Sequence, residues 1–242
     1  MSIYYIPVAS ANTFKVAVLN SKGGCGKSMV ATNLSCWYAV EGLDTALIDF
    51  DPQGSALRWL TLRPSKHPNV HGISGGHRAK TVTRSWQMRL PSETQRVVID
   101  TPAGVRGFEL GELIRQCDVI VIPVLPSDAD IHAGAGFIAD LLLDARIRSA
   151  GTRVVVVANR IKSNTRIYAS LQRFLDRLEF PFVAQFSDTQ TYVQAAQQGL
   201  GLCEMRADAM VQREIAQWQR LLASIEASAK PIVPTRAPLA AG

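Results

Sequence analysis

The feature that most constrains the fold of this chain is a glycine-rich run directly after an apolar stretch near the N-terminus. The run is Lys22-Gly23-Gly24-Cys25-Gly26-Lys27-Ser28, and it follows apolar residues 14–19. Glycines let the backbone curl so that its N–H groups face a phosphate, while a lysine reaches the outer phosphates and a serine hydroxyl ligates Mg²⁺. Helical sequence resumes at Met29. A strand, this loop and a helix form a P-loop, so the run predicts a site for a nucleoside phosphate.

Lys22 is a cation that a P-loop does not require. It lies five residues before Lys27, at the mouth of the loop. Positive charge stabilises the charge that develops on a phosphoryl group during transfer. We therefore expect the positive charge of Lys22 to act on a phosphate from outside that phosphate's own P-loop, and the lysine can belong to another subunit.

Hydrophobic runs alternate with helical stretches along the rest of the chain. Residues 14–20, 45–50, 96–100, 119–124, 153–158 and 182–186 are expected strands, and several are continuous Val and Ile, as in a parallel sheet buried on both faces. The expected helices are residues 27–41, 107–116, 131–150, 164–178, 191–198 and 207–229. The alternation predicts a doubly wound α/β domain, with helices on both faces of a mostly parallel sheet. That single domain spans residues 1–229, with residues 1–13 as a short arm and 230–242 as a disordered tail.

Acidic side chains stand at the ends of two expected strands. Asp49 and Asp51 lie in the run Leu-Ile-Asp-Phe-Asp-Pro-Gln-Gly, where strand alternation places both on one face. Asp100 ends the run Val-Val-Ile-Asp, which reads as a Walker B acid that holds Mg²⁺ directly or through water. Asn159 follows a third strand, and its amide can pair with an adenine edge. Because ligands bind beyond the carboxyl ends of such strands, we expect these residues to share one rim with the P-loop.

The composition of the chain indicates what kind of partner and which cellular compartment to expect. The formal charge is +6 and the sequence pI is about 9.4, which favours a polyanionic partner. The apolar runs fall short of the ~20 residues that span a bilayer. The four cysteines, Cys25, Cys36, Cys117 and Cys203, contain no CxxC pair, so a reduced cytoplasmic chain is expected, and the cysteines indicate neither a metal site of their own nor a disulfide framework.

Four motifs together resemble one family. They are the Lys22–Ser28 run, the Asp49/Asp51 run, Pro-Val-Leu-Pro-Ser at 123–127, and Tyr-Val-Gln-Ala-Ala-Gln-Gln-Gly at 192–199. The chain resembles the ParA/MinD family of deviant Walker A ATPases over residues 14–225. It is similar to the smaller ParA-like members, because the 13-residue arm leaves no room for an N-terminal helix-turn-helix domain.

The resemblance implies that two protomers sandwich two ATP molecules face to face, with ATP and Mg²⁺ as cofactors. Lys22 would reach the partner's nucleotide, Lys27 would hold the β- and γ-phosphates, and Asp51 would activate the hydrolytic water. Ser28 would bind Mg²⁺, with Asp49 and Asp100 supporting it through water. The implied ATP-binding residues are Lys22, Gly23, Gly24, Cys25, Gly26, Lys27, Ser28, Met29 and Asn159. Cys25 is expected to pack as a small apolar side chain.

The resemblance also implies non-specific DNA binding by the ATP dimer, at the nucleoid. Basic residues dominate 55–96, with Arg58, Arg63, Lys66, Arg78, Lys80, Arg84, Arg89 and Arg96. The family often carries an arginine just before its late helix, where this chain has Asp188 and Thr189. The DNA contacts are therefore expected at Arg166, Arg173, Arg206 and Arg213. A cargo adaptor protein would stimulate hydrolysis, and the cargo would be a plasmid, a chromosome or a protein assembly.

Two alternatives stay open. A MinD-like ATPase would bind membrane through its C-terminal helix, but the apolar stripe of Val211, Ile215, Trp218, Leu222 and Ile225 is more typical of core packing, so membrane binding is not expected. A P-loop metabolic enzyme would need further catalytic residues, for which Asp128, Asp130 and His132 are the candidates.

Overall fold

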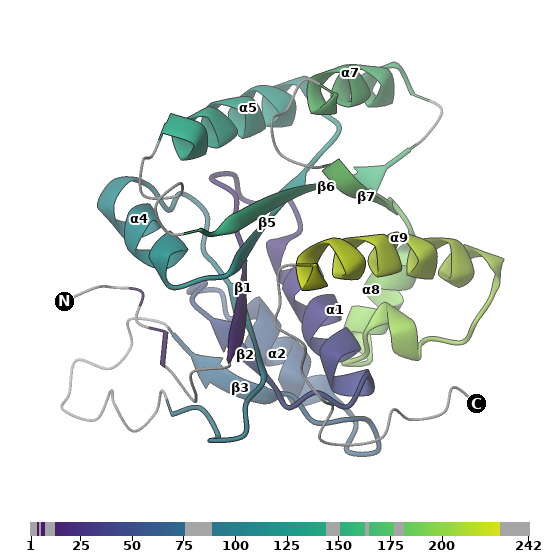
Figure 1. The fold of residues 1–242 in the computed structure, drawn as a ribbon. Coiled ribbons are helices and arrows are strands. Elements are labelled where there is room, and N and C mark those ends of the chain that lie inside the picture. The colour runs from purple at the N-terminus through teal and green to yellow at the C-terminus, as the bar shows by residue number, and fades with distance from the viewer. Residues whose placement is uncertain are drawn as a thin grey trace.

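The fold is a seven-stranded sheet in which all observed strand pairs are parallel (Figure 1). The computed structural model describes residues 4, 6–7, 13–75, 89–143, 151–162, 165–176 and 182–227. The strand order is β3-β2-β4-β1-β5-β6-β7. The strands are β1 (Phe14–Val18), β2 (Thr45–Asp49), β3 (His71–Ser74), β4 (Arg96–Asp100), β5 (Val119–Val124), β6 (Arg153–Ile161) and β7 (Phe182–Ser187). The predicted doubly wound α/β class is confirmed.

Helices cover both faces of the sheet. One face carries α1 (Lys27–Val40), α2 (Ser55–Leu62), α8 (Gln190–Gln197) and α9 (Ala209–Glu226), with the short 3-10 helix η1 (Leu202–Glu204) between the last two (Figure 1). The other face carries α4 (Gly107–Arg115), α5 (Asp128–Leu143) and α7 (Arg166–Leu175). Alternate side chains of each central strand enter the two cores, which explains why these strands are continuously apolar.

The register of the central strands gathers the acidic strand ends. β2 pairs with β4 so that Asp49 lies opposite Asp100, and β1 pairs with β4 so that Val18 also lies opposite Asp100. The P-loop leaves the same end of β1. The predicted shared rim is therefore the carboxyl edge of adjacent strands β2, β4 and β1.

Element boundaries differ from expectation at several places. β1 ends two residues early, and β6 extends to Ile161, so Asn159 lies inside the strand rather than after it. α5 begins three residues early, at Asp128, and its expected end at 144–150 lies outside the described residues. Neither α2 nor β3 was predicted from the sequence. The expected tail, 230–242, and most of the arm also lie outside the described residues.

The apolar stripe of α9 packs into the core, as predicted. Val211, Trp218, Leu222 and Ile225 are buried, and the Trp218 ring stacks on Phe186 with centroids 4.3 Å apart. A helix face used in this way is not available for a membrane. In the described part of the chain, no helix combines the length and the apolar character needed to cross a bilayer.

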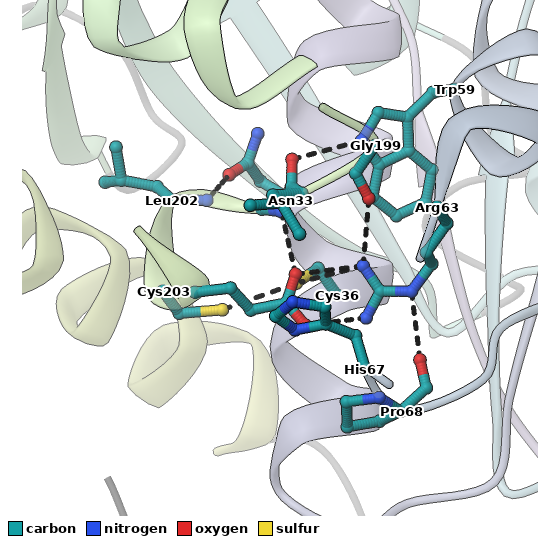
Figure 2. Close-up of polar contacts among 12 residues, drawn as sticks. Asn33, Cys36, Trp59, Arg63, His67, Pro68, Gly199, Leu202 and Cys203 are labelled. Atoms are coloured by element: carbon teal, nitrogen blue, oxygen red, sulfur yellow. Dashed lines mark hydrogen bonds and ion pairs between the residues drawn. The ribbon is translucent and has the colours of Figure 1, made fainter. Parts of the chain in front are cut away.

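Two arginines of the basic stretch at 55–96 are buried, whereas Arg58, Lys66 and Arg89 are exposed. Arg63 forms a two-pronged ion pair with Glu204, with N–O distances of 2.9 and 2.7 Å, and both side chains are buried (Figure 2 shows Arg63). Arg96 is buried beneath Glu226, whose Oε1 lies 3.2 Å from its Nε. These arginines stabilise the fold and cannot contact a phosphate backbone. Arg78, Lys80 and Arg84 lie outside the described residues.

Candidate nucleotide site

The loop between β1 and α1 has the backbone of a phosphate-binding turn. Gly24 and Gly26 have φ angles of 76° and 94°, a region that side chains with a Cβ rarely adopt. A Cβ at Gly26 would also lie 2.0 Å from Nδ2 of Asn159. Glycine is therefore required at Gly26 both by backbone conformation and by the close approach of β6.

The start of α1 offers unpaired N–H groups to a ligand. Gly26 is its N-cap and supplies no side-chain cap, and the first turn contains no acidic residue. The exposed N–H groups and the positive end of the helix dipole favour an anion at this position. Lys27, the first helical residue, is buried, and its Nζ donates to the Lys22 carbonyl oxygen at 3.1 Å. Its ammonium group is thus held inside the loop.

Lys22 is paired with an acid of its own chain. Its Nζ lies 2.7 Å from Oδ1 of Asp130, and the Lys22 side chain is 38% exposed against 12% for Asp130. Ser127 fixes Asp130 from the other side, since its hydroxyl donates to Oδ2 and accepts from the Asp130 N–H. Asp130, a catalytic candidate of the metabolic-enzyme alternative, is therefore engaged in holding Lys22. The Lys22–Asp130 contact was not predicted from the sequence.

Asp100 is a buried carboxylate without a hydrogen-bond donor. Its side chain is fully buried, and neither oxygen has a hydrogen-bond partner. Burial raises the pKa of Asp100 to about 7; the neighbouring Ser28 hydroxyl opposes that rise, and Asp49 adds to it. An unpaired buried carboxylate is costly unless a cation compensates it. Mg²⁺ fits this site, because Ser28 and Asp100 offer the hard oxygen ligands that it prefers.

Asp49 and Asp51 differ in how many hydrogen bonds their carboxylates accept. The Asp49 carboxylate accepts N–H groups from Asp51 at 2.9 Å, Ala56 at 3.0 Å and Leu57 at 3.1 Å, so it clamps the turn after β2 and the start of α2. Burial raises the pKa of Asp49, and these three hydrogen bonds oppose the rise. Asp51 is only half-buried and accepts one hydrogen bond, from the Gln53 N–H at 2.9 Å. Its remaining carboxylate capacity is open to a water molecule or a partner.

Asn159 joins β6 to the P-loop. Its Nδ2 donates to the Cys25 carbonyl oxygen at 2.8 Å, and its Oδ1 accepts the N–H of Arg160 at 2.9 Å. One amide hydrogen and one oxygen lone pair remain, enough for the predicted contact with an adenine edge. Arg160 is the one non-glycine residue with positive φ in the described chain, at 53°.

Cys25 is packed in the loop rather than exposed for reaction. Its side chain is buried and its Sγ donates to the Lys22 carbonyl oxygen at 3.3 Å. Burial raises the pKa of the Cys25 thiol, which disfavours the reactive thiolate. This environment agrees with the expected packing role.

A cleft of about 540 Å³ opens beside the start of α1. It runs between α2, the end of β6 and the start of α8, and its walls include Ser28, Met29, Arg58, Asn159, Asp188 and Thr189. Four of the implied ATP-binding residues line this cleft, namely Gly26, Ser28, Met29 and Asn159, and the adenine contact was predicted for Asn159. Arg58 and the turn at Asp188 were missed as lining residues because they come from distant parts of the sequence.

Comparison with known proteins decides the family. A model of the CobQ/CobB/MinD/ParA nucleotide-binding domain matches residues 16–202. The chain belongs to this family. A curated relative from Halothiobacillus neapolitanus, "Maintenance of carboxysome distribution protein A", is 29% identical over 175 residues, which cover 72% of this chain and 79% of the relative. The chromosome-partitioning ATPase Soj of Thermus thermophilus is 26% identical, covering 67% of this chain and 77% of Soj.

Several solved structures have the same fold as this chain, although their sequence identity to it is low. The MinC:MinD cell division complex of Aquifex aeolicus gives a TM-score of 0.67 at 16% identity, covering 93% of this chain and 99% of that one. A Cyanothece McdA variant in complex with ATP gives 0.63 at 16% identity, covering 93% and 100%. The MinD of Pyrococcus horikoshii, with Mg-ADP, gives 0.62 at 14% identity, covering 90% and 100%. Together with the family model, these structures confirm a P-loop ATPase fold.

The four arginines predicted to contact DNA are all exposed but do not lie on one helix face. Arg166 and Arg173 are on α7, while Arg206 and Arg213 lie before and on α9, on the opposite side of the sheet. Asp188, at the position where the family often carries arginine, is paired with Lys162 at 3.2 Å. DNA binding by these residues stays a prediction.

Proposed function

We propose that this chain is a ParA-like ATPase that forms an ATP-sandwich dimer, binds DNA non-specifically in that state, and hydrolyses ATP slowly. The observation that carries the proposal is Lys22, a partly exposed lysine at the mouth of a complete P-loop, whose ammonium group is paired with Asp130 of its own chain. An exposed ion pair of this kind is worth about 0–1 kcal/mol, so a phosphate of a partner's nucleotide can outcompete it.

Each residue of the site has a task in hydrolysis. Lys27 and the N–H groups of the loop hold the β- and γ-phosphates, and Asn159 orients the base. Ser28 and Asp100 would hold Mg²⁺, with Asp49 in support, and the bound ion would neutralise phosphate charge. Asp51 orients the attacking water and Lys22 of the partner subunit stabilises the developing charge. Asp51 is the one water-orienting acid proposed here, so turnover is expected to be slow until DNA and an adaptor protein stimulate it.

The cargo proposal follows the curated relatives. One is named for carboxysome distribution and one for chromosome partitioning. Both names describe the placement of a large object in the cell. We propose that this chain likewise segregates DNA or positions a protein assembly over the nucleoid, through an adaptor. The MinD-like alternative loses its main support, because the α9 stripe is buried.

Binding to random-sequence DNA and to anionic liposomes separates the two branches. We expect the ATP-bound protein, and not the ADP-bound protein, to bind DNA. If the dimer contacts 6–10 phosphates, its affinity should fall roughly 10³–10⁵-fold between about 50 and 200 mM salt. Alanine variants at Arg166 and Arg173, compared with variants at Arg206 and Arg213, identify the face of the sheet that is used. ATP-dependent liposome binding without DNA binding would contradict the proposal.

Asp130 is expected to restrain dimerisation. Asp130→Asn removes the intrachain partner of Lys22 while the Ser127 contact can persist. Unfolding free energy should change by only about 1 kcal/mol or less, since Lys22 is partly exposed. The ATP concentration that half-saturates dimer formation, measured by light scattering, should fall. Asp140→Asn, at an exposed position on the same helix, is the matched control. A higher half-saturating concentration for Asp130→Asn would show that Asp130 supports the dimer instead.

A further inference from the structure

Two cysteines far apart in sequence meet on the α1 face of the sheet. Sγ of Cys36, on α1, lies 3.4 Å from Sγ of Cys203, on η1, across 167 residues of sequence (Figure 2). Cys36 is fully buried, whereas Cys203 is partly exposed. Cys203 is therefore the more accessible residue of the pair, and the Cys36 sulfur is buried beside it.

The backbone around the pair is fixed on both sides. The Leu202 N–H donates to Oδ1 of Asn33 at 2.8 Å, which ties η1 to the α1 turn before Cys36 (Figure 2). A Cβ at Gly201 would lie 2.4 Å from Sγ of Cys36, so the chain that carries Cys203 is pressed against α1. A disulfide needs an S–S distance of about 2.0 Å, and this arrangement requires only a short approach of the two sulfurs.

Charged groups surround the buried sulfur. Nη1 of Arg63 lies 3.9 Å from Sγ of Cys36, and the same guanidinium is fixed by Glu204 and by the Gly199 carbonyl oxygen at 3.1 Å. Burial raises the pKa of the Cys36 thiol well above its usual range, and the Arg63 charge opposes that rise. His67 contacts Glu204 at 3.0 Å. Within the described residues, no group of three or more His, Cys, Asp or Glu is arranged to hold a metal ion.

We propose that Cys36 and Cys203 are a reversible redox site, in which a peroxide drives formation of an intrachain disulfide. The partly exposed Cys203 thiol attacks one oxygen of hydrogen peroxide, giving a sulfenic acid and one water. The Cys36 sulfur then attacks the Cys203 sulfur; the S–S bond forms, the S–O bond breaks, and the hydroxyl leaves as a second water with the Cys36 proton. Two thiols are oxidised and one peroxide is reduced to two waters. A dithiol reductant reverses the reaction.

The cross-link joins the helix of the P-loop to the C-terminal part of the domain. α1 begins at Lys27, and η1 lies between α8, which lines the nucleotide cleft, and α9. A disulfide here closes a very long loop and restricts the unfolded chain. The oxidised protein should consequently melt at a higher temperature than the reduced protein. The disulfide chemistry does not depend on the proposed function.

Thiol mapping of the whole chain tests the proposal. The reduced protein is treated with a small molar excess of hydrogen peroxide, denatured in N-ethylmaleimide, digested, and analysed by mass spectrometry. We expect the four free thiols to fall to two, with a peptide pair linked through Cys36 and Cys203, and dithiothreitol to restore all four. The thermal midpoint should rise by several degrees on oxidation and return on reduction.

Single-residue variants test whether Cys36 and Cys203 are the two thiols that peroxide oxidises. Cys203→Ser should lose no thiol. Cys36→Ala should give no linked peptide pair and should lose only the Cys203 thiol, which is oxidised to the sulfenic or sulfinic acid without a partner. Cys117→Ala, a control elsewhere in the core, should still lose two thiols. Circular dichroism checks that each variant is folded. The proposal is overturned if Cys203 accumulates as sulfinic acid while Cys36 stays alkylatable, if Cys203 links two chains on a non-reducing gel, or if peroxide consumes no thiols.

Discussion

Asp51→Asn is expected to lower ATP turnover by about 100-fold or more while ATP still binds. The half-buried Asp51 carboxylate receives one N–H, from Gln53, and is therefore free to orient a water, whereas Asp49 already accepts three backbone N–H groups. Asn keeps the shape and the Gln53 contact but cannot accept a proton as a carboxylate does. Phosphate release under single-turnover conditions measures the loss.

The same variant should accumulate in the ATP state. Because binding contacts remain, Asp51→Asn should hold ATP for much longer than the parent chain, as shown by nucleotide retained after rapid desalting. Asp176→Asn, an exposed acid at the end of α7, is the control and should leave turnover unchanged. Turnover within about ten-fold of the parent would remove Asp51 from the proposed mechanism, and loss of ATP binding would assign it to the structure of the β2–α2 turn.

Lys22→Gln and Lys27→Gln are expected to differ in ADP affinity, although both should lose turnover. Lys27 belongs to the chain that binds the nucleotide, so losing its charged contact should cost roughly 10- to 150-fold in affinity for ADP. Lys22 is proposed to act on the partner's nucleotide, and in this proposal the dimer forms with ATP and not with ADP. Its replacement should therefore change ADP affinity by roughly five-fold or less. Calorimetric titration with Mg-ADP gives both values.

The difference in ADP affinity between Lys22→Gln and Lys27→Gln shows on which subunit's nucleotide Lys22 acts. Equal losses of ADP affinity would mean that Lys22 acts on the nucleotide of its own chain. Unchanged turnover in Lys22→Gln would mean that it serves only as the partner of Asp130. Lys15→Gln, outside the site on β1, is the matched lysine control.

The geometry of the candidate nucleotide site was largely predictable because its sequence signals are local. A buried strand, a glycine-rich turn and a helix are adjacent in sequence, and Asp49 and Asp100 end continuous apolar runs. Parallel pairing then brings strand ends to one edge, so the shared rim follows from the fold class. The boundaries of β6 were less predictable, since Asn159 lies within a strand that continues past its apolar core to Ile161.

The remaining features depend on contacts between residues that are distant in sequence. β3 has one buried residue in four, so its sequence carries no strand pattern, and the basic content around α2 concealed an amphipathic helix. Arg63 looked like a DNA-binding cation until the fold placed Glu204 against it, 141 residues away. The Lys22–Asp130 pair and the Cys36–Cys203 contact were hidden for the same reason.

The central claim is that ATP converts this chain from monomer to dimer through Lys22, and its most direct test is molar mass by sedimentation equilibrium. The Asp51→Asn protein is measured with Mg-ATP and with Mg-ADP, beside the double variant that also carries Lys22→Gln. The account predicts twice the 26.4 kDa chain mass for the Asp51→Asn protein with Mg-ATP. It predicts the mass of a single chain for the same protein with Mg-ADP and for the double variant with either nucleotide. The same mass in all samples, or an ATP dimer that survives loss of Lys22, would contradict it.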